Sequence, residues 1–84
     1  MMPTMTEREV PLPISFDAEA DATYIQLADE PRLGWRHGKT VPVLVDKSNG
    51  MVNIDLDEDG RIIGIEILPA RGLLSDKILQ ALGV

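Results

Sequence analysis

The segment that most constrains the fold is residues 55–68, DLDEDGRIIGIEIL, in which apolar and polar side chains alternate around Asp59-Gly60. Alternation with a period of two is typical of a half-buried strand, and an aspartate followed by glycine is a strong signal for a hairpin turn. The same letters also match the pattern of an EF-hand calcium loop. The segment therefore has two interpretations, a β-hairpin and a metal site, and the flanking residues must decide between them.

Asn49-Gly50, just upstream, has the composition of a second two-residue hairpin turn. If both turns are two-residue loops, apolar residues pair throughout: Val43 with Leu56, Val45 with Ile54, Leu56 with Ile63, Ile54 with Ile65, and Val52 with Ile67. A slip of one residue in either hairpin would turn aspartates toward the buried side. The sequence therefore predicts a three-stranded antiparallel meander over residues 40–68, and a three-residue loop at the second turn would need a compensating bulge.

The N-terminal part of the chain predicts a tail followed by another hairpin. Residues 1–11 contain Pro3 and Pro11 and show no alternation, which indicates a disordered or extended tail. Alternation begins at Leu12 and continues to residue 27 around a four-residue loop at 18–21. Because Pro13 cannot donate a backbone hydrogen bond, we expect the first strand at an edge of the sheet. We assign residues 12–84 to a single domain.

A short helix is predicted at the C-terminus, at about residues 74–82. Ser75 and Asp76 suit its start and Gly83 its end. Its apolar stripe is Leu74, Ile78, Leu79 and Leu82. A helix this short is not stable alone, so we expect it to cover the mixed second face of the sheet or to dock on a second subunit. The predicted fold class is α+β, a small antiparallel sheet of about five strands with one C-terminal helix.

Composition excludes several classes of function. The chain has 84 residues and no cysteine, so it has neither disulfides nor thiolate metal sites. Its net charge of −6 opposes nucleic-acid binding by a folded surface and suits a basic protein partner. No secretory signal and no apolar run of membrane-spanning length is found, which leads us to expect a cytoplasmic protein without membrane contact.

The calcium-loop pattern is complete as a string, with candidate metal ligands at Asp55, Asp57, Asp59 and Glu66. An EF-hand, however, needs a helix on each side of its loop. Strand-like alternation precedes the segment, and Gly64 and Pro69 are unsuited to a helix on its C-terminal side. We therefore favour a solvated hairpin tip with no metal. A second group, Asp17, Glu19 and Asp21, is interpreted as turn-forming residues because Ala22 stands where that pattern requires glycine.

Trp35, Arg36 and His37 lie in a predicted loop and are the candidates for contact with a partner. The alternative is that the tryptophan covers one end of the sheet. A catalytic role for His37 is not favoured, because a lone histidine without a cysteine or an activated serine specifies no reaction. We predict no catalytic residues and no cofactor.

Two blocks of sequence are similar to a known family. They are Phe16-Asp17-x-Glu19-x-Asp21-x-x-Tyr24-Ile25-x-Leu27 and, from Val52, VNIDLDEDGRIIGIEIL. Over about residues 14–70 the chain resembles the bacterial proteins catalogued as domain of unknown function 2283. The resemblance implies a small β-rich domain with no established activity, so it assigns no catalytic residue. It also implies a suspected association with small toxin-like proteins.

These observations leave three functional hypotheses. The first is a non-enzymatic protein-interaction module that forms a homodimer, because open sheet edges and a mixed second face invite pairing. The second is an antitoxin-like partner of a small basic toxin-like protein. The third is a carboxylate-based metal-binding protein or metal-dependent enzyme.

Overall fold

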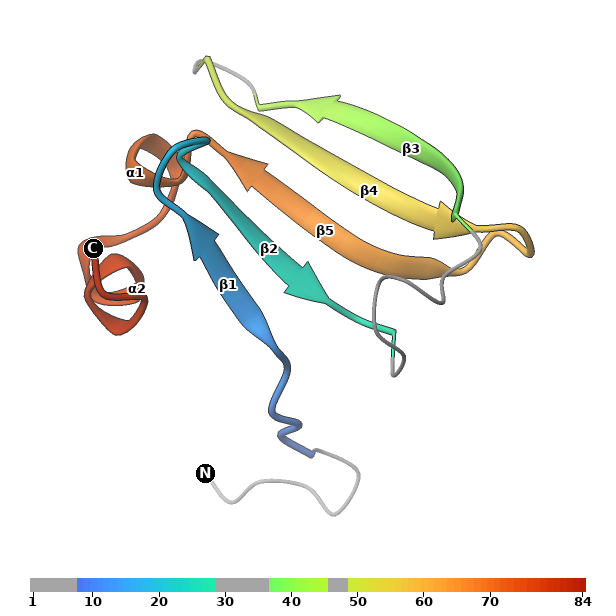
Figure 1. Cartoon of the computed structure of the whole chain (residues 1–84), viewed down its shortest axis with the longest axis horizontal. Helices are drawn as coiled ribbons and strands as arrows, with labels where there is room; N and C mark the ends of the chain where they lie inside the picture. The colour runs from blue at the N-terminus through green and yellow to red at the C-terminus, as the bar shows by residue number, and fades with distance from the viewer. Residues whose placement is uncertain (1–7, 29–36, 46–48) are drawn as a thin grey trace, which may run out of the picture.

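The computed structural model describes residues 8–28, 37–45 and 49–84. They form five strands, β1 (Ile14–Asp17), β2 (Ala22–Gln26), β3 (His37–Leu44), β4 (Met51–Asp57) and β5 (Ile62–Leu68), and two short helices, α1 (Ala70–Leu73) and α2 (Asp76–Ala81) (Figure 1). All five strands belong to one antiparallel sheet with the order β1-β2-β5-β4-β3. The expected five-stranded antiparallel sheet is confirmed, whereas the helical part is two short helices instead of one.

The first hairpin agrees with the sequence prediction. Asp17 pairs with Ala22 across a four-residue loop, and β1 lies at an edge of the sheet. The Asp17 carboxylate accepts hydrogen bonds from the backbone N–H groups of Glu19 and Ala20, which stabilises the turn. Asp21 closes the loop with a positive φ of 50°. Asp17 and Asp21 are therefore turn-forming residues, as predicted.

The β4–β5 hairpin has the predicted register along most of its length and a different tip. Ile54 pairs with Ile65 and Val52 with Ile67, as expected, but Leu56 pairs with Ile62 instead of Ile63. The loop has three residues, because Asp57 N–H donates to the Arg61 carbonyl, and Gly60 adopts a φ of +84°. A three-residue loop ending in a left-handed glycine requires a bulge to restore the register, and the register shifts between Asp55 and Leu56.

The predicted register of the β3–β4 hairpin is wrong by four residues. Val43 pairs with Val52 and Val41 with Ile54, and the hairpin closes where Val45 N–H donates to the Gly50 carbonyl. Asn49-Gly50 is thus not a type I′ turn, which would need positive φ at both positions, and neither residue has one. Because the error is an even number of residues, each side chain still lies on the face predicted for it.

Close packing explains why residue 50 is glycine. Gly50 is buried, and a Cβ added there would lie 2.5 Å from Cδ1 of Leu73, the last residue of α1. This glycine lets the helical end of the chain approach the start of β4. The sequence signal of a turn at Asn49-Gly50 therefore reflects a close contact between two distant segments.

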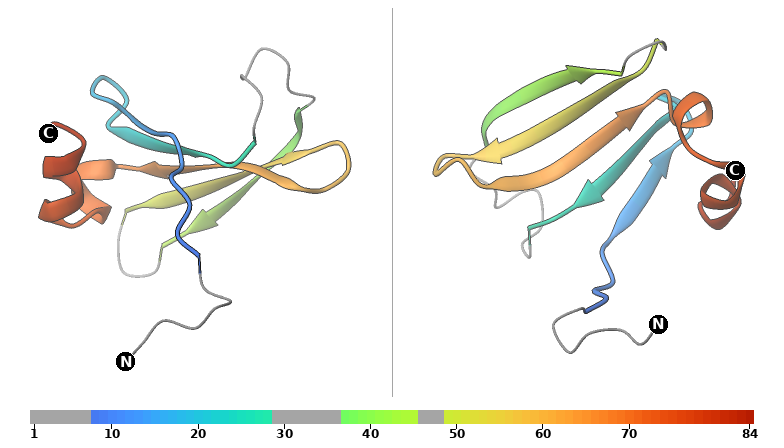
Figure 2. Two further views of the ribbon diagram at one scale, coloured as in Figure 1. Left: turned by 90° about the horizontal axis from the view of Figure 1, so that it is seen from below. Right: turned by 180° about the vertical axis from the view of Figure 1, so that it is seen from behind.

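The C-terminal helix starts and ends where predicted but is preceded by an unpredicted one. Ser75 caps α2 by accepting a hydrogen bond from the Ile78 N–H, and Gly83 follows the helix with a φ of +84°. Leu74 has an extended ψ of 150° and separates α2 from α1, so the apolar stripe expected from residue 74 onward is interrupted. Both helices lie at one end of the sheet beside the β1–β2 turn (Figure 2). Neither lies across the mixed face, which corrects the expected position of the helix.

The strand pairing divides the sheet into two chemically different faces. The apolar face carries Ile14, Phe16, Thr23, Ile25, Val41, Val43, Val52, Ile54, Leu56, Ile65 and Ile67, with Lys39 at its rim. The polar face carries Ser15, Asp17, Ala22, Tyr24, Gln26, Thr40, Pro42, Leu44, Met51, Asn53, Asp55, Gly64, Glu66 and Leu68. The described residues form a single layer, and neither face is covered by a second one (Figure 2).

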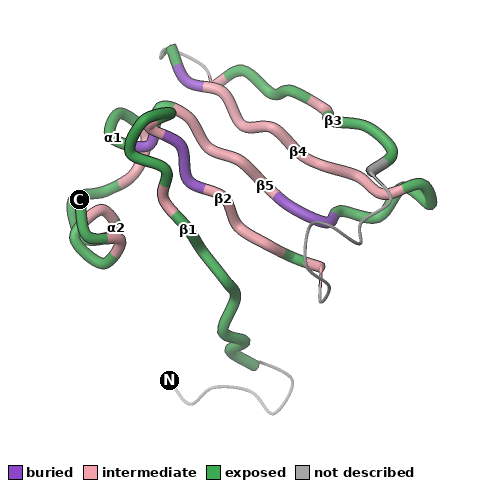
Figure 3. Tube along the Cα trace, viewed as in Figure 1, coloured by how far each residue is buried: buried purple, intermediate pink, exposed green. Residues whose placement is uncertain are grey.

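Few side chains are buried in the described part of the chain. Its buried hydrophobic residues are Ala22, Ile63 and Ala70, and the only other buried side chain with a Cβ is Thr23 (Figure 3). Every valine and leucine of the apolar face remains at least partly accessible. Among these described residues, cross-strand pairs and the packing at the helical end hold the sheet, and no closed hydrophobic core is formed.

We predict that Gly50→Ala lowers the free energy of unfolding by about 1–3 kcal/mol, because the new methyl group overlaps Leu73. In a Leu73→Ala background the same change should cost markedly less, giving a coupling that urea unfolding of the four proteins measures. If the losses in unfolding free energy of Gly50→Ala and Leu73→Ala simply add, Gly50 is required for the turn and not for contact with Leu73.

Candidate functional site

A tyrosine that crosses a glycine organises the polar face. Tyr24 on β2 extends its ring over Gly64 on β5, where a Cβ would overlap the phenol group. The Tyr24 hydroxyl then donates a hydrogen bond of 3.0 Å to Oδ2 of Asp55 on β4. Gly64 is therefore required for a cross-strand bond that spans β5 entirely.

Asp55 extends this bond to the opposite edge of the sheet. Its Oδ1 accepts a hydrogen bond of 2.6 Å from the Thr40 hydroxyl on β3. Beside it, the Asn53 amide donates a hydrogen bond of 3.0 Å to Oε1 of Glu66, which joins β4 to β5. We call the Tyr24, Asp55 and Thr40 chain the tyrosine relay; it connects β2, β4 and β3 through side chains and crosses β5 at Gly64.

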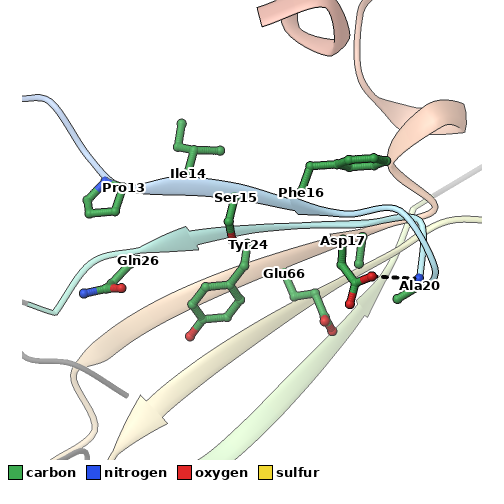
Figure 4. A pocket seen from close by; sticks show the side chains of 10 residues that line it. Pro13, Ile14, Ser15, Phe16, Asp17, Ala20, Tyr24, Gln26 and Glu66 are labelled. Atoms are coloured by element: carbon green, nitrogen blue, oxygen red, sulfur yellow. Dashed lines mark hydrogen bonds between the residues drawn. The ribbon is translucent and has the colours of Figure 1, made fainter. Parts of the chain in front are cut away.

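A pocket of about 360 Å³ lies over β1, β2 and β5 next to the tyrosine relay. Its polar lining residues are Ser15, Asp17, Tyr24, Gln26 and Glu66. Figure 4 shows these side chains on one side of the ribbon, while Ile14 and Phe16 project to the other side. The polar part of the pocket lining, with Asp17 and Glu66, thus belongs to the polar face, and Ile14 and Phe16 belong to the apolar face.

The four alternative metal ligands are separated by the hairpin geometry. Asp55 belongs to the tyrosine relay and Glu66 is bonded to Asn53. Asp57 accepts hydrogen bonds of 2.9 Å from the N–H groups of Asp59 and Arg61, so it caps the turn. Within residues 8–28, 37–45 and 49–84, no three His, Cys, Asp or Glu side chains are grouped so that they could hold a metal ion.

Asp21 attaches the helical end of the chain to the first hairpin. The Ala70 N–H donates 2.6 Å to the Asp21 carbonyl, and the Arg71 N–H donates 3.1 Å to its carboxylate. The Arg71 guanidinium forms an ion pair of 3.4 Å with the same carboxylate and lies 5.2 Å from the centre of the Phe16 ring. Because Phe16 is on the apolar face, α1 reaches over that end of the apolar face only.

The three partner-contact candidates are the first residue of β3 and the two residues that precede it in the sequence. Trp35 and Arg36 are outside the described residues. His37 is the first residue of β3, and its side chain is outside the description as well. Their role in contact with a partner stays a prediction.

The apolar face is the second candidate site, and it is an open surface rather than a pocket. Its middle row is Ile14, Ile25, Ile65, Ile54 and Val41, one residue from each strand in sheet order. Ile14 is 50% exposed and Val43, in the next row, is 45% exposed. A contiguous apolar surface of this extent is typical of sites that bind another polypeptide.

Sequence reasoning predicted this face and missed the tyrosine relay. The alternation predicted the faces of the strands except at the bulge, where Ile62 pairs with Leu56 in place of Ile63, because the period of a strand does not depend on the loop length. The relay joins residues 24, 55 and 40, and only the β2–β5 pairing brings Tyr24 within reach of the other two. Gly64 inside a strand pattern was the one available signal, since such a glycine often marks a close approach.

Comparison with known proteins gives one match. The chain matches the family described as "Protein of unknown function (DUF2283)" over residues 14–71, which is more than half of its length. No curated protein and no solved structure matches it. Among the described residues, no helix is long and apolar enough to cross a membrane.

We predict that Tyr24→Phe lowers the free energy of unfolding by about 1 kcal/mol, because it removes the hydrogen bond to a partly buried carboxylate. The cost should approach zero in an Asp55→Ala background, whereas Ser15→Ala, opposite Tyr24 on β1, should be additive with Asp55→Ala. Urea unfolding at one protein concentration measures all six proteins. An undiminished cost of Tyr24→Phe without Asp55 would contradict the relay.

Proposed function

The chain belongs to the DUF2283 family, whose description names no activity, and from its geometry we propose that it is a protein-interaction module whose apolar sheet face binds a second polypeptide. One observation carries the proposal. A sheet face made almost entirely of isoleucine, valine and leucine is left without a covering layer by the described residues. Antiparallel sheets with one solvated face normally pack the other on a core.

The energy at stake is comparable with the stability of the whole domain. Five strands spaced by about 4.8 Å, with three rows of side chains on a face, give roughly 500 Å² in projection. Covering this area at about 25 cal/mol per Å² contributes roughly 12 kcal/mol before the entropic cost of association. Small domains have net stabilities of about 5–15 kcal/mol, so occupation of this face decides how stable the fold is.

The polar groups support a binding role more than a catalytic one. Asp55 and Glu66 are held in cross-strand hydrogen bonds, and Asp57 is held by two backbone N–H groups of its turn. These bonds stabilise the sheet and orient its acidic face. The net charge of −6 supports a basic partner for that face, which is the arrangement of the antitoxin-like hypothesis.

We predict that a thiol placed on the apolar face is protected from alkylation. The chain has no cysteine, so Ile54→Cys carries a single reactive group on the apolar face of β4. Asn53→Cys is the matched control, because residue 53 is its neighbour on the same strand, is similarly accessible and points to the opposite face. Both rates are measured with a soluble maleimide, in purified protein and in permeabilised cells that carry the variant gene at its natural level.

The proposal expects Ile54→Cys to react at least tenfold more slowly than Asn53→Cys in the cells, and also in the purified protein where the partner is retained. Unfolding in urea should abolish the difference, since it removes the partner together with the fold. If Ile54→Cys and Asn53→Cys react at equal rates both in the cells and in the purified protein, the proposal is refuted.

A further inference from the structure

We propose that the polypeptide that covers the apolar face is a second copy of this chain, so that two sheets pack face to face as a two-layer sandwich. This inference rests on the proposed function and names its partner. Four observations carry it: the blocked edges of the sheet, the distribution of charge, the area exposed and the position of the helical end.

The edges of the sheet disfavour the other common route to a dimer, in which strands pair edge to edge. β3 forms one edge, and Pro42 in its middle has no N–H with which to extend the ladder. β1 forms the other edge and has only four residues, with Pro13 directly before it. Association of two copies is therefore directed to a face of the sheet.

The charge distribution favours the apolar face for self-association. A net charge of −6 on each copy opposes the approach of two identical chains. Yet the strand carboxylates of Asp17, Asp55 and Glu66 lie on the polar face, and none lies on the apolar face within the described strands. In the sandwich the two acidic faces point outward, at opposite sides of the dimer. Packing through the polar faces would instead bring these carboxylates together.

The exposed area matches what a stable dimer needs. The apolar face, with five strands and three rows of side chains, measures roughly 500 Å² in projection, and its protruding side chains present a larger accessible area than that. This area is of the same order as the roughly 800 Å² per partner of a standard interface.

The helical end restricts how the two copies are arranged. Arg71 lies over Phe16, so α1 rises on the apolar side at the end of the sheet next to the β1–β2 turn. Two copies with their helical ends together would collide there. The geometry therefore requires a two-fold axis across the strands, with the helical ends at opposite ends of the sandwich. The sheets would then pack about 10 Å apart, and Ile65, in the middle row of the central strand, would lie near the axis.

The first test measures mass in solution by sedimentation velocity over a thousandfold range of concentration. At micromolar concentration, the mass measured for the natural chain should be twice the 9.2 kDa of one copy. Ile54→Asp should raise the dissociation constant at least a hundredfold, because it places a carboxylate in the middle row. Leu44→Asp adds the same charge to an exposed position of the polar face and should leave the dimer intact. A natural chain that is a monomer throughout would overturn the inference.

The second test does not depend on whether Ile54→Asp still folds. Ile65→Cys, treated with a short bismaleimide at low protein concentration, should give a covalent dimer with high yield. Glu66→Cys, the next residue on β5, faces away from the partner and should remain monomeric. Cross-linking of Glu66→Cys and not of Ile65→Cys would assign the interface to the polar face and overturn the inference.

The outcomes separate this inference from the proposed function. A monomer whose Ile54→Cys thiol is protected only in cells binds a different partner, so the proposed function stands and the second copy is rejected. A purified monomer with a protected thiol covers its own apolar face, and both proposals fall. A dimer with a protected thiol and a cross-link at residue 65 supports both.

Discussion

The pairing of β4 with β5 is the constraint on which the rest of the structure depends. Ile54 opposite Ile65 and Val52 opposite Ile67 fix which side chains face each way across the central strands, and β2 and β3 continue this division to both edges. Because side chains alternate strictly along a strand, one register creates both an apolar and an acidic face. A single layer can bury neither, so the same pairing that builds the sheet also creates the apolar surface to which we assign the proposed partner.

The two faces contribute differently to the domain. On the polar face, Tyr24 passes over Gly64 to Asp55, and Thr40 completes a chain of side chains that joins β2, β4 and β3 across β5. This face is internally satisfied and can stay in water. The apolar face has no comparable directional bonds, and its stabilisation depends on removing its isoleucines and valines from water. The directional bonds thus lie on one face, and the driving force for the proposed association lies on the other.

The sequence predicted what depends on local periodicity and missed what depends on distant contacts. Alternation located the strands and, except at the bulge near Ile62, their faces, and Ser75 and Gly83 located the ends of α2. Asn49-Gly50 was misinterpreted as a two-residue turn, because a glycine that is needed for contact with Leu73 cannot be distinguished in the sequence from a turn glycine. The segment that matches the EF-hand pattern is a hairpin, as predicted. Asp57 accepts a hydrogen bond within its turn, and Asp55 accepts one from Tyr24 across the sheet. The tyrosine relay and α1 depend on pairings that no local pattern encodes.

The most direct test of the account is whether the apolar face is dry in solution. Methyl groups can be observed by NMR in the presence of a soluble paramagnetic agent, which broadens the signals that solvent reaches. The account predicts that the methyl signals of Ile25, Ile54 and Ile65 remain sharp, while those of Leu44, 77% exposed on the polar face, are strongly broadened. Equal broadening of the isoleucine and Leu44 methyl groups would contradict it.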